Sequence, residues 1–174
     1  MKEKSVFERL LKELYDNLSR VREGVIIIPE YVNLIQNKRY IKQIFESIKQ
    51  EISKIYEVPK NVLDRVNLYF VDYLPSIYKN TITLGVYESL KNSYGKVYSA
   101  SVYVLKKLLY NPKKLIETIA HELTHYIQDL RKKIKKSSSE YASFKEYYNS
   151  EEELEARAIS KEVLRRLYRS GFIY

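Results

Sequence analysis

Apolar residues recur at every third or fourth position in four segments of this chain, which is the period of a helix with one buried side. Glycine or proline follows the first two segments. Asn111 and Pro112 precede the third, where asparagine caps free amides and proline fits the first turn. The pattern predicts helices over residues 5–23 and Lys38 to Tyr56, a third from Pro112, and a last one from Asn149 or Ser150 to about Arg169.

Runs of β-branched and aromatic residues lie between these helical segments. They predict strands over Val66 to Tyr73, Thr81 to Tyr87 and Val97 to Leu105, while Val25 to Ile28 is either a strand or a buried connection. Residues alternate in character along the third run, so a strand there carries different side chains on its two faces. These segments predict an α+β fold with N-terminal helices and a small three- or four-stranded mixed sheet with an edge strand.

Length and hydropathy favour one domain over residues 1–174. The chain is 45% apolar, which is ordinary for a soluble fold of this size. Its apolar runs fall well short of the roughly 20 residues that a membrane span needs. The N-terminus is charged and lacks the apolar core of a secretory signal. We therefore expect an intracellular protein without a membrane partner.

The formal charge of +9 raises the question of nucleic-acid binding, because clustered lysines and arginines gain affinity for phosphate by releasing counterions. The densest basic run, Arg131 to Lys136, lies where the third helix should end, and cations there complement the helix dipole. Charge alone is weak evidence. A basic module that binds nucleic acid or protein, with a latent or structural zinc site, is the alternative to the function developed below.

The third helix carries the sequence His121, Glu122, Leu123, Thr124, His125, which is the pattern H-E-x-x-H. Residues four apart are rotated by about 40° in an α-helix, so both imidazoles can reach one zinc ion. Glu122 lies on the adjoining flank, where it can act on a zinc-bound water without binding the metal. These are the only histidines in the chain, so the pattern predicts one zinc ion per chain, with Glu122 as general base.

A hydrolytic zinc ion commonly has three protein ligands, and the chain has no cysteine and no further histidine, so the third must be a carboxylate. The last helix begins with an acidic cluster. By helical phase Glu152 and Glu153 flank its apolar side, while Glu151 and Glu155 turn outward. A capping role with Ser150 also explains Glu153. We favour Glu153 as the ligand, with Glu152 and Glu155 as alternatives.

These motifs resemble those of the gluzincin metallopeptidases, in which H-E-x-x-H on one helix is followed by a glutamate ligand, often as E-x-x-A, on a later helix. Here the second motif reads Glu153, Leu154, Glu155, Ala156. The small size is similar to that of the single-domain minigluzincins. The resemblance covers about Val66 to Leu167. It leaves residues 1–60 as a helical extension of open role and implies a catalytic core over residues 61–174.

The resemblance implies a zinc-dependent peptidase that acts on a peptide or protein. We expect it to be an endopeptidase. His121, His125 and Glu153 would be the ligands and Glu122 the base. Val97 to Leu105 would be the edge strand that binds the substrate, through Ser99, Ala100, Ser101 and Val102. The family also uses a histidine or tyrosine to stabilise the oxyanion. Without a third histidine, the candidates are Tyr148, Tyr147 and Tyr141.

Overall fold

The structure is a computed structural model that describes residues 38–173 except 77, 133, 135 and 137–139. The predicted helix over residues 5–23 and the segment Val25 to Ile28 lie outside the described residues. The helices, strands and contacts of the fold are those of the described residues.

The long helices begin where the hydrophobic pattern predicts. They are α2 (Lys38–Tyr56), α4 (Pro112–Leu130) and α6 (Glu151–Arg169). The helix that begins at Pro112 ends at Leu130, before Ile134, the last apolar residue of its predicted pattern. Asn111 caps α4 by accepting a hydrogen bond from the amide of Lys114 at 3.1 Å. Shorter elements were not predicted, because four or five residues are too few to show a period. These are α3 (Lys60–Leu63), α5 (Phe144–Tyr148) and a 3-10 helix η1 (Lys106–Tyr110).

Three strands form one mixed sheet, β1 (Val66–Val71), β2 (Gly85–Lys91) and β3 (Val97–Leu105). Their order is β1-β3-β2, with β3 parallel to β1 and antiparallel to β2. The predicted α+β fold is confirmed. The prediction of a strand from Thr81 was wrong by four residues. Gly85 pairs with Val104, and β3 ends one residue later, so the residues before Gly85 have no strand to pair with.

β3 is the central strand of the sheet, so the prediction that it is the substrate-binding edge was wrong. Val102 pairs with Leu68 of β1 on one side and with Tyr87 of β2 on the other. The other proposed substrate-binding residues of β3, Ser99, Ala100 and Ser101, also have partners in β2. Alternation along a strand reveals its two faces but not its neighbours, because the neighbours depend on distant parts of the chain.

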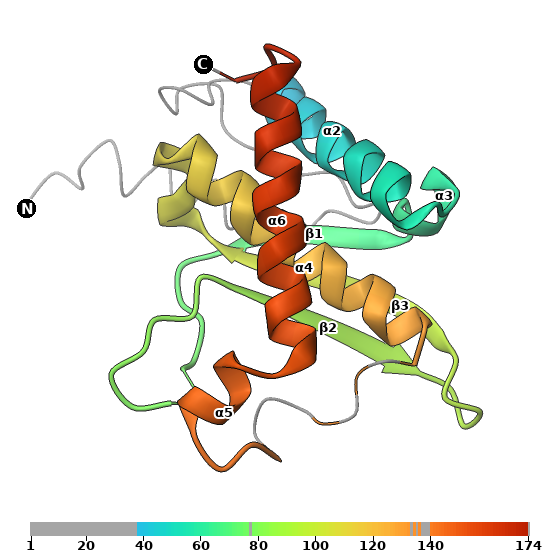
Figure 1. Ribbon diagram of the computed structural model, residues 1–174, viewed down its shortest axis with the longest axis vertical. Helices are drawn as coiled ribbons and strands as arrows, with labels where there is room; N and C mark the ends of the chain where they lie inside the picture. The colour runs from blue at the N-terminus through green and yellow to red at the C-terminus, as the bar shows by residue number, and fades with distance from the viewer. Residues whose placement is uncertain (1–37, 77, 133, 135, 137–139, 174) are drawn as a thin grey trace, which may run out of the picture.

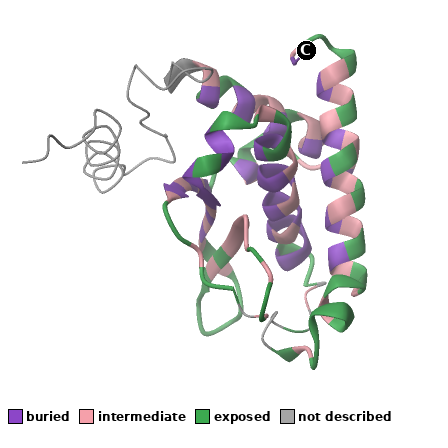
Figure 2. Ribbon diagram, turned by 90° about the vertical axis from the view of Figure 1, so that its left-hand side faces the viewer, coloured by how far each residue is buried: buried purple, intermediate pink, exposed green. Residues whose placement is uncertain are grey.

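Helix α4 lies across one face of the sheet, and both α2 and α6 contact α4 (Figure 1). Figure 2 shows the buried residues on the sides of these elements that face one another. Helix α2 places Ile41, Ile44 and Ile48 in the same hydrophobic cluster as Leu123 and Ile127 of α4. The proposed division near residue 60 therefore does not separate two cores, because α2 is part of the single cluster around α4.

No helix in the described part of the chain is both long and apolar enough to cross a bilayer.

Candidate metal centre

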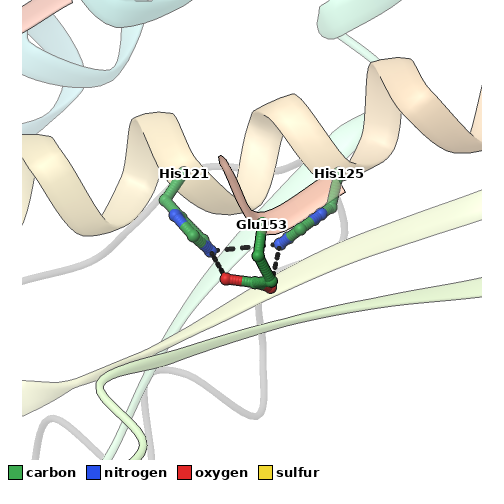
Figure 3. Close-up of side chains that lie close together, drawn as sticks. All are labelled: His121, His125 and Glu153. Carbon is green, nitrogen blue, oxygen red and sulfur yellow. Dashed lines mark hydrogen bonds and ion pairs between the residues drawn. The ribbon is translucent and has the colours of Figure 1, made fainter. Parts of the chain in front are cut away.

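His121 and His125 project from the same side of α4, one helical turn apart (Figure 3). Their ring centroids are 4.7 Å apart, and their Nε2 atoms approach to 3.1 Å. The predicted convergence of the two imidazoles is therefore present. It follows from the helical period alone, since Asn111 and Pro112 start a regular helix ten residues earlier.

Glu153 brings its carboxylate to both imidazoles from the first turn of α6. Its Oε2 lies 3.3 Å from Nε2 of His121, and its Oε1 lies 3.0 Å from Nε2 of His125. The side chain is buried. Ala156, one turn later on α6, is fully buried and lets the two helices approach closely.

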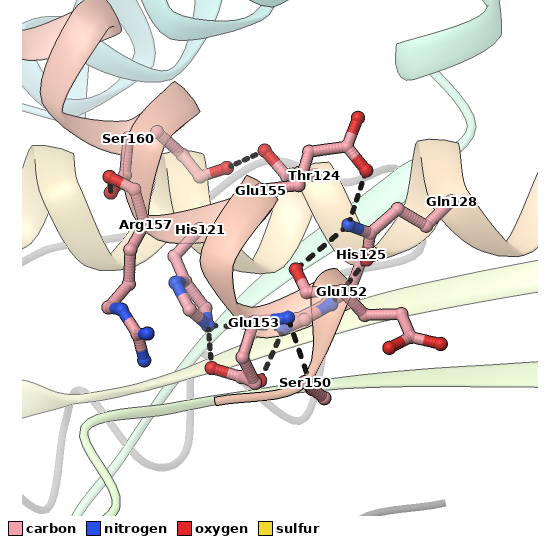
Figure 4. Close-up of polar contacts among 11 residues, drawn as sticks. His121, Thr124, His125, Gln128, Ser150, Glu152, Glu153, Glu155, Arg157 and Ser160 are labelled. Atoms are coloured by element: carbon pink, nitrogen blue, oxygen red, sulfur yellow. Dashed lines mark hydrogen bonds and ion pairs between the residues drawn. The ribbon is translucent and has the colours of Figure 1, made fainter. Parts of the chain in front are cut away.

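The capping role of Ser150 and the position of the Glu153 carboxylate coexist. The Ser150 hydroxyl accepts from the backbone amide of Glu153, so capping uses the main chain and leaves the carboxylate for the histidines. Glu155 instead accepts hydrogen bonds from Tyr56 and Gln128, and Glu152 offers its backbone carbonyl to Gln128 (Figure 4). Of the three candidate ligands, the structure brings Glu153 to the imidazoles.

Gln128 determines which nitrogen of His125 carries the proton. The Gln128 amide donates to the Glu152 carbonyl and to the Glu155 carboxylate, both at 2.9 Å, so its Oε1 is an acceptor. That oxygen lies 2.8 Å from Nδ1 of His125, which must therefore be the donor. In a neutral imidazole only one nitrogen is protonated, so Nε2 of His125 presents a lone pair toward Glu153 and His121.

The cluster thus places three electron-pair donors around one point. All the candidate ligand atoms lie within 4.8 Å of one another, and the side chain of Glu153 is buried. Ligands about 2.0–2.1 Å from a tetrahedral zinc ion are roughly 3.3 Å apart, close to the distances observed here. His121, His125 and Glu153 could therefore hold a metal ion.

The pKa values in the cluster reflect the attraction between the Glu153 carboxylate and the two imidazoles. Burial raises the pKa of Glu153, but hydrogen bonds and charge from the two histidines outweigh it and hold that pKa far below its ordinary value. Burial alone would lower the pKa of His125. The carboxylates of Glu153 and Glu122 have the larger combined effect and raise that pKa to about 9. Both shifts have the same cause, which is the close approach of the Glu153 carboxylate to the imidazoles.

Glu122 is buried between α4 and strand β2. A Cβ atom built on Gly85 of β2 would lie 2.9 Å from Oε1 of Glu122. The carboxylate thus lies against the start of the edge strand, next to the histidines but outside the ligand cluster. Burial raises the pKa of Glu122, although the two histidines lower it. A buried carboxylate of raised pKa beside a metal site suits a proton acceptor.

Tyr147 and Tyr148, two of the tyrosines proposed to stabilise an oxyanion, have different partners. Tyr147 forms a hydrogen bond with Glu153, and burial, the charge of Glu153 and this hydrogen bond all raise the pKa of Tyr147. Tyr148 lies instead under the guanidinium of Arg157, 3.5 Å from ring centroid to Cζ. The ring of Tyr141, the third candidate, lies beside that of Tyr147, with the ring centroids 5.6 Å apart and the planes tilted by 60°. The structure brings only Tyr147 of the three to Glu153.

Asp129 fastens the edge strand to the helix that carries the histidines. It is buried near the end of α4 and accepts hydrogen bonds from Tyr87, Ser89 and Lys91. These three residues alternate along the inner face of β2. Sequence reasoning missed this contact, although donors at alternate positions of a strand are a readable sign of a shared acceptor.

Comparison of the chain with known protein families, with curated proteins and with solved structures finds no match. The resemblance to gluzincins therefore rests on the two short motifs. The functional argument rests on the geometry of the site.

Proposed function

We propose that this protein is a zinc-dependent peptidase. The observation that carries the proposal is the convergence of His121, His125 and Glu153, with the buried carboxylate of Glu122 beside them. Two imidazoles and one carboxylate are a ligand set that zinc accepts and that leaves room for a further ligand. Hard cations such as Mg²⁺ prefer oxygen ligands, so the two imidazoles favour zinc.

A bound zinc ion would supply Lewis acidity, polarising a peptide carbonyl and lowering the pKa of the attacking water. Glu122 accepts the proton from that water as the new C–O bond forms. It then donates the proton to the leaving nitrogen as the C–N bond breaks. Tyr147 has a hydroxyl beside the cluster that can donate to the developing oxyanion.

The strand that would bind substrate in this proposal is β2. Within the described residues it pairs with β3 on one side only, and Gly85 lies directly against Glu122. An extended peptide added to the open side would gain main-chain hydrogen bonds next to the general base. Asp129 supports this arrangement by holding β2 on α4.

The proposal is tested with Glu122→Gln. We expect the variant to keep about one zinc ion per chain and to cleave an unfolded protein at least about 100-fold more slowly, because the amide accepts no proton. Metal content is measured by atomic emission and cleavage by gel electrophoresis. Glu151→Gln, an exposed acid on α6, is the matched control and should cleave like the wild type.

His125→Ala completes this test, because it should lose both zinc and activity. Cleavage by Glu122→Gln at the wild-type rate would refute the role of Glu122. Wild-type protein that binds zinc but cleaves no peptide would refute the peptidase.

A further inference from the structure

Arg157 has a guanidinium that lacks an anionic partner. Its Nη1 atom is buried and donates no hydrogen bond, and no carboxylate in the part of the chain that the structure describes forms an ion pair with the side chain. A guanidinium has five N–H donors in a rigid fork, and a buried donor without an acceptor is destabilising. The neighbouring arginines on α6, Arg165 and Arg166, both pair with Glu162.

The position of Arg157 puts this unpaired cation beside the metal centre. It follows Glu153 by four residues on α6, so the two side chains project from the same side of the helix. In Figure 4 the guanidinium of Arg157 and the carboxylate of Glu153 extend from α6 toward the same side. The ring of Tyr148 lies 3.5 Å from Cζ, which holds the guanidinium in place before any ligand arrives.

The charges around Arg157 point to the kind of group that it binds. A guanidinium next to a divalent cation is repelled by it. The carboxylate of Glu153 contacts the two histidines and forms no ion pair with Arg157. Both cations are stabilised if an anion binds between or beside them. Tyr148 is 44% exposed, so this part of the site opens to solvent and the anion can come from outside the chain.

We propose that Arg157 binds a carboxylate of the substrate and so directs the peptidase to peptides with a negative charge near the cleaved bond. The inference rests on the proposed function, and it adds a substrate class to it. A planar carboxylate matches the guanidinium fork and forms two parallel hydrogen bonds with it. The carboxylate belongs either to the C-terminus of the peptide or to an aspartate or glutamate side chain.

Two pairs of peptides distinguish these sources. In the first pair a neutral peptide ends in a free acid or an amide, and in the second an amidated peptide carries glutamate or glutamine at one internal position. We expect wild-type protein to prefer the charged member of one pair by about 10- to 100-fold in kcat/KM, mainly through KM, since a charged hydrogen bond contributes on that scale. The pair that shows the preference identifies the source.

Variants assign the preference to Arg157. Arg157→Met should abolish it, so that the charged and neutral members of each pair are cleaved with equal kcat/KM, and Arg157→Lys should retain part of it because lysine keeps the charge without the fork. Arg165→Met, an exposed arginine on the same helix, is the control and should keep the full preference. Equal zinc content in all variants shows that the site is intact.

Binding is also measured without turnover. Zinc-loaded Glu122→Gln is titrated calorimetrically with the same peptides, with and without Arg157→Met. If the charged peptide binds more tightly than the neutral one and this difference requires Arg157, the inference is supported. A wild-type protein that cleaves no peptide would overturn only the proposed peptidase activity. Equal affinity for both members of each pair, or an unchanged preference in Arg157→Met, would overturn the inference and leave the peptidase standing. If Arg157→Met does not fold, Arg157→Lys takes its place, and a preference in that variant equal to that of the wild type would overturn the inference.

Discussion

At the scale of single residues, Gly85 allows the general base and the edge strand to meet. A Cβ atom there would lie 2.6 Å from Cγ2 of Thr118 and 2.9 Å from both Cγ and Oε1 of Glu122. These distances are shorter than van der Waals contact, and the colliding atoms belong to buried side chains of α4. The single hydrogen of glycine therefore sets how closely β2 approaches the carboxylate.

Gly85→Ala should displace Glu122 and reduce cleavage by about 100-fold or more, with zinc content unchanged, because a shift of about 1 Å at a catalytic group has effects of that size. Overpacking should also lower the free energy of unfolding by about 1–3 kcal/mol. The measurements are kcat/KM, metal content and urea denaturation.

The second-site variant Thr118→Ser separates the two effects of Gly85→Ala. It removes Cγ2, the closest atom, and should restore part of the lost stability, while the contact with Glu122 keeps activity low. Wild-type activity in Gly85→Ala would show that the carboxylate is not held by this contact.

At the scale of elements, the contact between β2 and α4 depends on one buried acid. Burial raises the pKa of Asp129, but hydrogen bonds from Lys91, Ser89 and Tyr87 outweigh it and hold the pKa below 3.8, its ordinary value. A carboxylate whose pKa is lower in the folded state stabilises the fold above its unfolded pKa. That contribution is lost as the pH falls through the folded pKa.

Asp129→Asn should therefore lower the free energy of unfolding by about 2 kcal/mol at pH 7, the scale of hydrogen bonds to a charged group. The difference from wild type should shrink at pH 3, which lies below 3.8, the ordinary pKa of this carboxyl group, so that the unfolded chain takes up a proton there. Denaturation at the two pH values checks both statements. Glu88→Gln, on the exposed face of the same strand, should have little effect at either pH. A pH-independent difference would show that the charge of Asp129 is not what holds the strand.

At the scale of the whole molecule, the ligand cluster joins two helices that are far apart in the chain. His121 and His125 belong to α4, whereas Glu153 belongs to α6, which also contacts α2. A metal ion bound to all three would link these helices only in the folded state. It should therefore stabilise the whole fold and not only the site.

Thermal unfolding tests this link. Zinc at about 1,000 times its dissociation constant should add about 4 kcal/mol. For a chain of this length that corresponds to a rise in Tm of about 10 °C over protein in EDTA. Magnesium should produce no comparable shift, because it prefers oxygen ligands. His125→Ala should show no zinc-dependent shift, and an equal Tm with zinc and with EDTA in the wild type would contradict the proposed linkage.

Local sequence rules determined the elements that carry the chemistry. The boundaries of α2 and β3 and the starts of α4 and α6 follow from apolar periodicity and from capping residues. The convergence of His121 and His125 follows from a spacing of four residues in a regular helix. These features depend only on residues within a few positions of one another, and the sequence displays such relations directly.

Relations between distant segments were decided only by the tertiary structure. Glu152 and Glu153 flank the same apolar side of the helix, so the choice of Glu153 over Glu152 depends on how α6 rotates against α4. The placement of β3 in the centre of the sheet depends on a parallel pairing with β1, some thirty residues earlier in the chain. The contacts of Asp129 and the unpaired guanidinium of Arg157 arise in the same way. Packing between segments sets them, and no local period encodes which distant side chains will meet.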